Sequence, residues 1–406
     1  MIFYEHTIYD PVKGVKMKKL QQDQRGFSHH FILPVLAFIA VGAIGAYLIS
    51  ISHAATAGPS DVVYRQLSSN ATTNGFYRYS AAGTTKYDTT SWNSNDILDV
   101  SQDQNWVLTI GAGDKLTALS KDGQTVVYPY AYTTQAVPAR YITSRSYACT
   151  SAVETARSAL FSKASGATTP KLYVALESIP CENLALNFSK ITHRFFGVDT
   201  SSTKTALTEN LTSDSDFSWV KSTATNGYAL LDINHQFRVV SPAGKTVFKA
   251  ASSVYGMYMS ENGKKLVYEK NGKNYFYLAN SNGKSAKSIL SNNYKTTHRF
   301  LAGISPNGAY VIFNSQIAKG TTWTLNSYTV SSKKVKTLDT GYSEGGTAIN
   351  GAVYGEKWLP ASNTIVYAKQ DVKGKTSQIL QVAATGSAKK VLVSASYDTS
   401  TSFNIY

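Results

Sequence analysis

The side chains that most often carry out chemistry are few in this sequence. After residue 60 the chain has three histidines, His193, His235 and His298. A zinc site or a nucleophile–base pair needs such a histidine at a set spacing from a second histidine, a cysteine or a carboxylate. No His-x-x-x-His pair and no paired-cysteine motif is present, and the tetrapeptide THRF occurs twice at different positions relative to the surrounding β-rich runs. The sequence therefore predicts no catalytic, metal-binding or cofactor-binding residue.

Two further groups have the residue types of a binding site. The acidic residues nearest to a cluster are Asp199, Asp214, Asp216 and Asp232. Aspartates of this kind most often serve in turns and caps, and we predict that role. Tyrosines are dense between residues 128 and 147, where exposed rings would form a sugar- or peptide-binding face. Alternation along β-strands is the simpler explanation for these five: Tyr128, Tyr130, Tyr132, Tyr141 and Tyr147.

The one long apolar segment is residues 31–51. Its 21 residues carry no charge, and at about 1.5 Å per residue a helix of this length crosses the hydrocarbon core of a bilayer. Residues 1–30 contain five Lys/Arg and three acidic residues, and the positive-inside rule keeps such an end in the cytoplasm. We predict a single-pass membrane protein whose C-terminal domain is extracellular.

Two other fates of this segment stay open. Ser52 and Ala54 stand at the −3 and −1 positions of a signal-peptidase site before Ala55, although the apolar run is longer than the core of a usual signal peptide. The motif RGFS from Arg25 resembles a prepilin processing site, but Phe31 stands where prepilins carry a glutamate. The whole segment also resembles the N-terminal anchors of exported proteins in Saccharibacteria-type bacteria.

Cys149 and Cys181 are the only cysteines. An even count on the exported side of a membrane favours a disulfide bond between them. The bond would close a loop of 31 intervening residues, which is worth about 3 to 4 kcal/mol in the chain-entropy treatment. Two buried thiols that never meet are the alternative.

The chain is basic, with a formal net charge of +15. Residues 1–30 hold five of the basic and three of the acidic residues, which leaves about +13 for the rest. Such a charge suits anionic partners, whereas lysines that solvate turns and sheet edges are the plainer explanation. No cluster of arginine with aromatic residues stands out, as a nucleic-acid surface would require. We predict a protein or an anionic cell-surface polymer as partner, and no specific nucleic acid.

From residue 58 onward the composition favours β-sheet. The chain holds 27 tyrosines beside abundant Thr, Ser and Val, which suit pleated strands. Only Ser151–Ala164 is predicted as a helix. A hairpin pattern, two β-rich runs around a polar turn, recurs seven times. The first apolar residues of the copies are Phe76, Leu116, Phe195, Phe237, Phe276, Leu325 and Ile379.

The spacing of the copies predicts the architecture. Successive copies lie 40, 79, 42, 39, 49 and 54 residues apart, and four-stranded propeller blades repeat every 40 to 50 residues, roughly. The interval of 79 is one blade with an insertion around 140–170, or it hides an eighth blade. A second hairpin precedes several copies, most clearly GMYMSENGKKLVYEK from Gly256 and LAGISPNGAYVIFNS from Leu301. Two hairpins make the four strands of one blade.

The segments SENGKKLVY and SPNGAYVIF, with YFYLANSNGK, resemble the TolB-type propeller repeat, whose turn reads S-P-D-G. The resemblance covers most of residues 60–400 and implies a β-propeller. Asn262 and Asn307 stand where the family's turn has Asp, and only Asp199 matches the second Asp of the family pattern. Because unlike functions share this repeat, the resemblance implies no activity.

The ends of the chain predict how the ring closes. The first copy lacks an innermost strand, and STSFNIY at the C-terminus supplies one; pairing the two removes exposed edges. We predict an all-β fold: a seven-bladed β-propeller at 61–406, with six or eight blades as alternatives, after a cytoplasmic tail (1–30), a transmembrane helix (31–51) and a linker (52–60). The predicted function is non-enzymatic binding of a protein or cell-surface polymer. A carbohydrate-active hydrolase or lyase is the alternative.

Overall fold

The fold was obtained as a computed structural model. It describes residues 4–9, 16–21, 61–67, 74–87, 89, 97–133, 148–164, 170–199, 204–206, 211–212, 218–233, 236–270, 275–291, 297–317, 322–342, 353–371, 375–396 and 402–406. The chain divides into two compact parts, Met1–Thr56 and Ala57–Tyr406. In the first part β1 (Tyr4–Tyr9) pairs antiparallel with β2 (Lys16–Gln21).

The predicted membrane segment at 31–51 and the linker at 52–60 lie outside the described residues. Within the ranges that the structure does describe, no helix is both long enough and apolar enough to span a bilayer.

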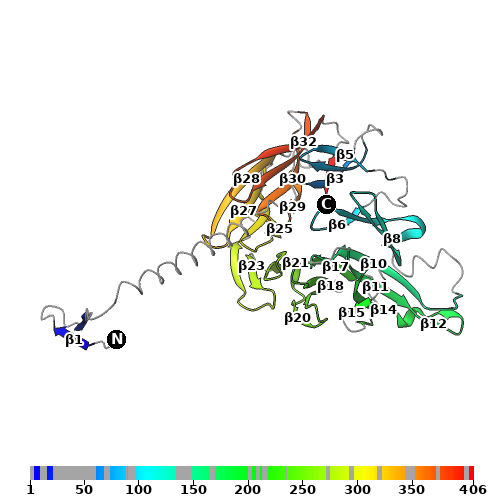
Figure 1. Cartoon of the computed structure of the whole chain (residues 1–406), viewed down its shortest axis with the longest axis horizontal. Coiled ribbons are helices and arrows are strands. Elements are labelled where there is room, and N and C mark those ends of the chain that lie inside the picture. Colours follow the sequence, from blue (N-terminus) through cyan, green and yellow to red (C-terminus); the bar gives the residue numbers. More distant parts are fainter. Residues whose placement is uncertain are drawn as a thin grey trace, which may run out of the picture. The chain divides into compact units, whose positions relative to one another are not determined.

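The second part consists of antiparallel four-stranded units, numbered I to VII here along the chain (Figure 1). Unit I joins the last strand to the first three: β33 (Ser402–Ile405), β3 (Val62–Leu67), β4 (Gly75–Ser80) and β5 (Gly83–Lys86). Unit II holds β6 (Ile97–Val100), β7 (Trp106–Ile110), β8 (Lys115–Ser120) and β9 (Thr125–Tyr132). Unit III holds β10 (Val153–Phe161), β11 (Leu172–Ile179), β14 (Thr192–Val198) and β15 (Lys204–Ala206), with β16 (Leu211–Thr212) also beside β14. A short parallel pairing of β9 with β10 merges units II and III into one sheet.

The remaining four units are separate sheets. Unit IV holds β17 (Ser218–Thr223), β18 (Ala229–Ile233), β19 (Gln236–Val240) and β20 (Thr246–Lys249). Unit V holds β21 (Val254–Met259), β22 (Lys265–Lys270), β23 (Tyr275–Asn280) and β24 (Lys287–Ser291). Unit VI holds β25 (Thr297–Ile304), β26 (Tyr310–Ile317), β27 (Thr322–Thr329) and β28 (Lys334–Tyr342). Unit VII holds β29 (Val353–Trp358), β30 (Thr364–Asp371), β31 (Thr376–Ala383) and β32 (Lys390–Ser396).

Neighbouring units pack face to face through buried side chains. Units V and VI share a core in which the rings of Phe276 and Phe313 lie 6.0 Å apart, edge to face. Comparable clusters join I with II, II with III, III with IV, IV with V and VI with VII. A further cluster, with Tyr64 and Phe403, joins unit VII back to unit I. Packing among the described residues therefore runs through the whole series of units and returns to its start.

The predicted closure is confirmed. β33 pairs antiparallel with β3, from Tyr64 opposite Ile405 to Leu67 opposite Ser402, so the C-terminal strand becomes the first strand of unit I. The seven predicted hairpins are also confirmed, because each one forms the third and fourth strands of a unit. In Figure 1 the first strands, such as β6, β17, β21 and β29, lie toward the middle, and β20, β28 and β32 lie toward the outside.

The helix predicted at Ser151–Ala164 is wrong, because this segment forms β10, the first strand of unit III. Its Ala, Glu and Arg residues favour a helix in isolation, but both of its edges are paired, with β11 along its length and with β9 at Thr155 and Ala156. Sheet packing on both faces overrides the local preference. Residues 140–147 and 165–169 of the predicted insertion lie outside the described residues. Extra elements of unit III follow later in the chain: β12 (Cys181–Glu182), β13 (Ala185–Leu186) and the 3₁₀ turn η2 (Phe188–Lys190).

Candidate functional site

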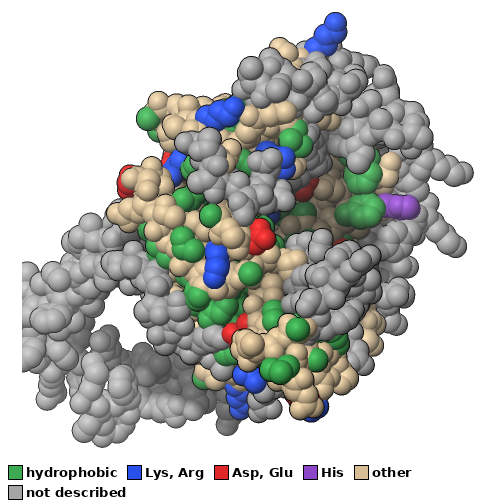
Figure 2. Space-filling model, turned by 90° about the vertical axis from the view of Figure 1, so that its right-hand side faces the viewer, with side chains coloured by type: hydrophobic (Ala, Val, Ile, Leu, Met, Phe, Trp, Pro, Cys, Tyr) green, Lys and Arg blue, Asp and Glu red, His purple; other side chains and the backbone are tan. Residues whose placement is uncertain are grey.

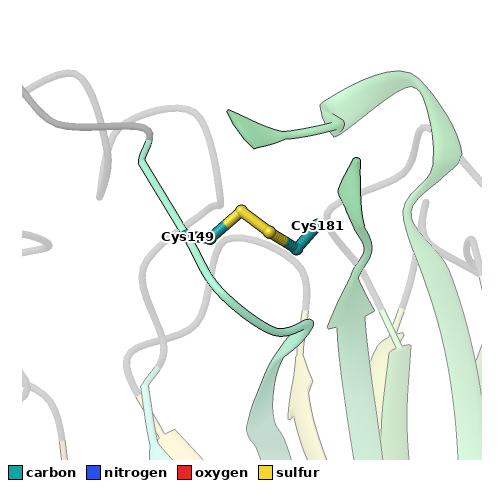
Figure 3. The surroundings of a disulfide bond; sticks show 2 residues. All are labelled: Cys149 and Cys181. Carbon is teal, nitrogen blue, oxygen red and sulfur yellow. A yellow bond between two sulfur atoms is a disulfide. The ribbon is translucent and has the colours of Figure 1, made fainter. Parts of the chain in front are cut away.

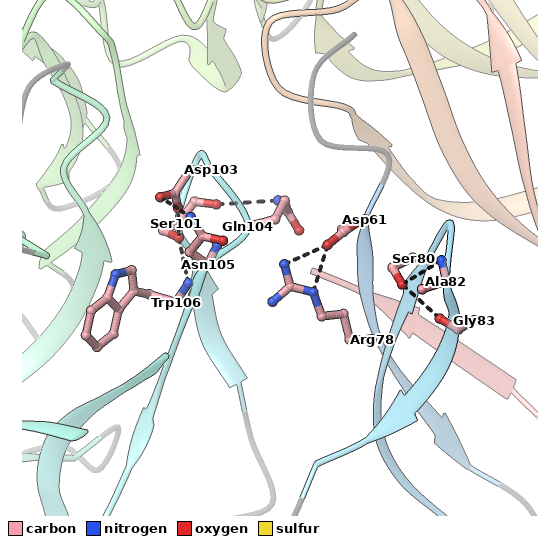
Figure 4. Close-up of polar contacts among 10 residues, drawn as sticks. All are labelled: Asp61, Arg78, Ser80, Ala82, Gly83, Ser101, Asp103, Gln104, Asn105 and Trp106. Carbon is pink, nitrogen blue, oxygen red and sulfur yellow. Dashed lines mark hydrogen bonds and ion pairs between the residues drawn. The ribbon is translucent and has the colours of Figure 1, made fainter. Parts of the chain in front are cut away.

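The turns between first and second strands are held by their own side chains. In unit II the Ser101 hydroxyl donates to Asp103 Oδ1 (2.6 Å) and accepts from the Trp106 N–H (2.9 Å), as Figure 4 shows. The Asn105 N–H also donates to Asp103 Oδ1 (3.0 Å). These bonds satisfy the polar groups of a tight turn without solvent, so the turn is rigid.

Units V and VI build the same turn with asparagine in place of aspartate. Ser260 donates to Asn262 Oδ1 and Ser305 donates to Asn307 Oδ1, each at 2.8 Å. An amide oxygen accepts these hydrogen bonds as a carboxylate oxygen does. The departure from the S-P-D-G pattern therefore removes a charge from the turn and keeps its geometry.

Turns from five units meet around one cavity of about 250 Å³, at the end where their first strands finish. The lining residues come from units II, IV, V, VI and VII: Gln102, Thr225, Glu261, Asn262, Pro306, Asn307, Ala361, Ser362 and Asn363. The cavity is wide enough for a small polar group or the end of a chain.

Glu261 connects four units across this cavity. Its Oε1 accepts a hydrogen bond from Gln102 Nε2 of unit II, and its Oε2 accepts one from the Ala361 N–H of unit VII (3.5 Å). Its backbone carbonyl accepts from the Thr225 N–H of unit IV (2.7 Å). The turns therefore form a hydrogen-bonded rim, and one carboxylate lies in the middle of it.

A charged cluster lies on the strands directly before these turns. The Asp99 carboxylate on β6 accepts a hydrogen bond from the Phe161 N–H at the end of β10 (2.7 Å). Burial raises the pKa of Asp99, and the ammonium groups of Lys163 and Lys357 oppose part of that rise. The side chain of Lys357 keeps access to solvent, yet desolvation by the surrounding protein lowers its pKa, with Asp99 acting against this and Lys163 adding to it. An acid of raised pKa beside an amine of lowered pKa is typical of functional sites.

Two more polar groups border the cluster. The Glu356 carboxylate on β29 accepts a hydrogen bond from the Asn314 amide of unit VI (2.6 Å). Burial raises the pKa of Glu356, and the Asn314 bond opposes the rise. The Tyr258 hydroxyl on β21 donates to the Leu301 carbonyl (3.2 Å), and its ring is partly exposed. Asp99 and Glu356 are thus both held by fixed donors of the fold.

The lowered pKa of Lys357 makes its amine a sensitive probe of this cluster. We expect its modification by an acylating reagent to have a pH midpoint below the ordinary lysine value of about 10.4, because desolvation disfavours the ammonium form. Asp99→Asn should lower the midpoint further, since it removes the carboxylate that stabilises the ammonium. Peptide mass spectrometry across a pH series measures both. A midpoint that rises in the Asp99→Asn variant would contradict this account.

The histidines singled out in the sequence do not meet. His193 is buried on β14, at 3% exposure, while His298 lies on β25 of another unit. The ring of His298 lies 6.5 Å from that of Phe300, edge to face. Figure 2 shows a face of the molecule where a histidine and hydrophobic side chains border a recess. His235 lies outside the described residues. Among the described residues no group of three or more His, Cys, Asp or Glu is placed to hold a metal ion.

The acidic and tyrosine candidates are also dispersed. Asp232 is buried on β18, and Asp199 directly follows β14. Asp214 and Asp216 lie outside the described residues. Two of the five tyrosines, Tyr128 and Tyr130, are buried in the core between units II and III, Tyr132 is half-buried beside them, and Tyr141 and Tyr147 lie outside the described residues.

The structure contains a disulfide bond between Cys149 and Cys181, with the two Cα atoms 5.8 Å apart (Figure 3). The bond lies beside a small apolar cluster that includes Ile179 and Leu186. The Cys149 N–H also donates to the Leu184 carbonyl (3.0 Å). These contacts fasten β12 and β13 to the chain that leads into β10.

One pentapeptide, GYSEG from Gly341, fits the pattern G-x-S-x-G of serine hydrolases. A nucleophile elbow places this serine between a strand and a helix. Here Gly341 and Tyr342 end β28, the fourth strand of unit VI. Ser343 itself lies outside the described residues.

A second cavity, of about 620 Å³, lies between unit I and the β8–β9 turn of unit II. Its wall contains the ion pair of Arg78 with Asp61 (2.6 Å), drawn in Figure 4. Lys86 and Lys121 also line it, with hydroxyl groups of serine and threonine. The cavity has both polar and apolar walls and is open to solvent, and it lies beside the apolar cluster that joins units I and II.

These sheets, their order and their closure define a β-propeller. No protein-family profile and no curated protein matches the chain in sequence. Among solved structures, prolyl endopeptidase matches 97% of this chain at 12% identity with a TM-score of 0.52, and the chain spans 59% of that protein. An oligogalacturonate lyase from Vibrio parahaemolyticus matches over 97% of both chains at 8% identity, with a TM-score of 0.46. A protein named TolB from Agrobacterium tumefaciens matches 84% of this chain and 91% of its own at 11% identity, with a TM-score of 0.36. Similarity at this level shows the fold alone.

Proposed function

We propose that this chain is a seven-bladed, TolB-like β-propeller that residues 31–51 hold on the outer side of a membrane, where it binds a macromolecule without catalysis. The blade number is supported by the seven units and by the core cluster between units VII and I. The tether and the orientation rest on the uncharged 21-residue segment and the basic residues before it.

The observation that carries the binding role is the rim of turns around Glu261. Hydrogen bonds within each turn and between turns make this end of the propeller rigid. A rigid surface loses little conformational entropy when it binds a macromolecule, because its loops are already ordered. In the neighbouring cluster Asp99 and Glu356 already accept hydrogen bonds from the protein, so they serve to hold the first strands in place.

The test uses the full chain, produced in a bacterium with a tag at each end. We expect a membrane-impermeant biotin reagent to label the C-terminal tag on intact cells and to label the N-terminal tag only after lysis. The detergent-solubilised chain should then bind members of a glycan and protein array and degrade none of the glycans. Labelling of the N-terminal tag on intact cells would overturn the orientation. Degradation of a glycan with no binding above background would overturn the non-enzymatic role.

The alternative function is a carbohydrate-active hydrolase or lyase. The observation that favours it is the raised pKa of Asp99 beside the lowered pKa of Lys357, since catalytic acids and bases are tuned in this way. If the chain degrades a polysaccharide, Asp99→Asn should reduce that activity by about 10²-fold or more. A serine hydrolase that used Ser343 as its nucleophile would lose its activity in the Ser343→Ala variant, whereas an enzyme that used Asp99 and Lys357 would keep it.

A further inference from the structure

Two sets of turns lie at one end of the propeller. In a four-stranded antiparallel unit, the turn between the first and second strands and the turn between the third and fourth strands lie at the same end. Backbone hydrogen bonds of 2.8 to 3.1 Å join the two turns within units II, V, VI and VII: Lys121 N–H to Asn105 O, Ser281 N–H to Lys264 O, Val330 N–H to Ala309 O, and Ala384 N–H to Asn363 O. This end also carries the rim around Glu261.

Lysines collect on this end, although they are scattered along the sequence. The turns and adjoining strand residues of units II and IV to VII here include nine solvent-exposed lysines within the described ranges: Lys121, Lys245, Lys264, Lys284, Lys287, Lys333, Lys334, Lys336 and Lys390. Lys171 of unit III and Lys357 are exposed at the same end. We call this surface the basic turn face. The exposed carboxylates described on the same turns are Asp103 and Asp122. Glu261 is bound within the rim, and Lys389 pairs with Asp339 and is not counted.

Solvation of turns does not explain why the lysines lie at one end of the molecule. Lysines at hairpin tips keep sheet edges soluble, but that role needs no particular end of the molecule. Here the lysines come from units II, IV, V, VI and VII, the same units whose first turns line the cavity. Like charges held on one rigid face repel one another, and an anionic partner relieves that repulsion.

The residue types define the partner's chemistry. The exposed cations described on these turns are lysines, which meet phosphate as compact point charges, and none is an arginine, whose planar fork pairs with carboxylates as well as phosphates. The turns offer Ser, Pro, Asn, Gly and Ala beside the lysines, and no exposed aromatic ring among their described residues on which a base would stack. Since the charges curve around a centre, a flexible chain can follow them, and the straight axis of a duplex cannot.

We propose that the basic turn face binds a flexible linear cell-surface polymer with phosphodiester linkages. The proposal rests on the extracytoplasmic binding function given above and specifies its surface and its ligand class. Each lysine that meets a phosphate releases a counterion, so affinity falls steeply as salt is raised.

The test compares two matched double variants of the full chain in detergent. Lys284→Gln with Lys334→Gln removes two charges from the basic turn face. Lys249→Gln with Lys375→Gln removes two exposed charges at the opposite ends of strands. The probe is a synthetic poly(glycerol phosphate), with polygalacturonate, duplex DNA and anionic vesicles as competitors. We expect the first variant to reduce the slope of log K against log salt by about 1 to 2, and the second to leave it unchanged.

The outcomes separate this proposal from the broader function. Equal losses of binding in both variants would overturn the basic turn face as a polymer site. Tighter binding to DNA, vesicles or polygalacturonate than to the phosphodiester polymer would overturn it as well. If the ligand found on the array binds both variants as tightly as it binds the parent, the basic turn face is not the binding surface. The proposed binding function would still stand. Circular dichroism and the denaturation midpoint, unchanged in both variants, show that a loss of binding is not a loss of folding.

Discussion

Phe403→Ala should lower the free energy of unfolding by about 3 to 5 kcal/mol, the usual cost of removing a buried phenyl ring. Phe403 lies on β33 and is fully buried. Its ring meets that of Tyr64 edge to face at 5.6 Å, in the cluster that joins unit VII to unit I. Since domains are stable by only about 5 to 15 kcal/mol in total, the variant should lose a large share of its stability. The denaturant midpoint of the full chain measures the loss.

Phe300→Ala is the matched control for this experiment. Phe300 also lies on a first strand, β25, but its side chain is 45% exposed. Nearly half of this side chain is already in solvent, so we expect a smaller change, of about 1 to 2 kcal/mol. Equal losses at the two positions would show that the ring does not depend on β33 for its closure.

The second large effect is expected at Asp339, on the fourth strand of unit VI. Its buried carboxylate accepts hydrogen bonds from the Tyr367 hydroxyl (2.7 Å) and from Lys369 Nζ (2.9 Å), and pairs with Lys389 Nζ (2.7 Å). All three partners belong to unit VII, so the carboxylate links two units. Asp339→Asn leaves these donors without an anion; because the two lysines are partly exposed to solvent, we expect a loss of about 1 to 3 kcal/mol, the usual cost of leaving a buried hydrogen-bonding group unpaired.

This loss should depend on pH. Burial alone would raise the pKa of Asp339, but hydrogen bonds from Lys389, Tyr367 and Lys369 outweigh it and hold the pKa below the ordinary value. A group with a lower pKa in the folded state stabilises the fold above its unfolded pKa, which is about 3.9 for aspartate. That stability is lost as pH falls through the folded pKa.

We therefore expect the difference between the parent and Asp339→Asn to be full at about pH 6 and to shrink below about pH 4. Asp122→Asn, at an exposed turn, is the control and should change stability by less than about 0.5 kcal/mol at either pH. A gap between the parent and Asp339→Asn that stays constant as pH falls would contradict the role assigned to the carboxylate.

The charged site was not predictable from the sequence. Asp99 and Lys357 are 258 positions apart and belong to no motif. Each stands just before a turn between first and second strands. That position was a usable signal, because first strands line the centre of a propeller. Which charges meet there depends on how all the units pack, and no local pattern records it.

The basic turn face was not predictable from the sequence either. In the sequence they appear as separate turn residues, and solvation explains each one. Only the antiparallel order of four strands places both kinds of turn at one end, and only the closed series of units places those ends around one cavity.

The sequence by itself determined the β-rich texture, the seven hairpins and the pairing of the C-terminal strand with the first copy, because alternation and turn residues act over a few neighbours. Tertiary structure decided the fate of Ser151–Ala164, where pairing on both edges overrode a helical composition. It also brought Asp99 beside Lys357, and Glu261 beside Gln102 and Ala361, because contacts between units depend on packing across the whole ring and not on nearest neighbours in the chain.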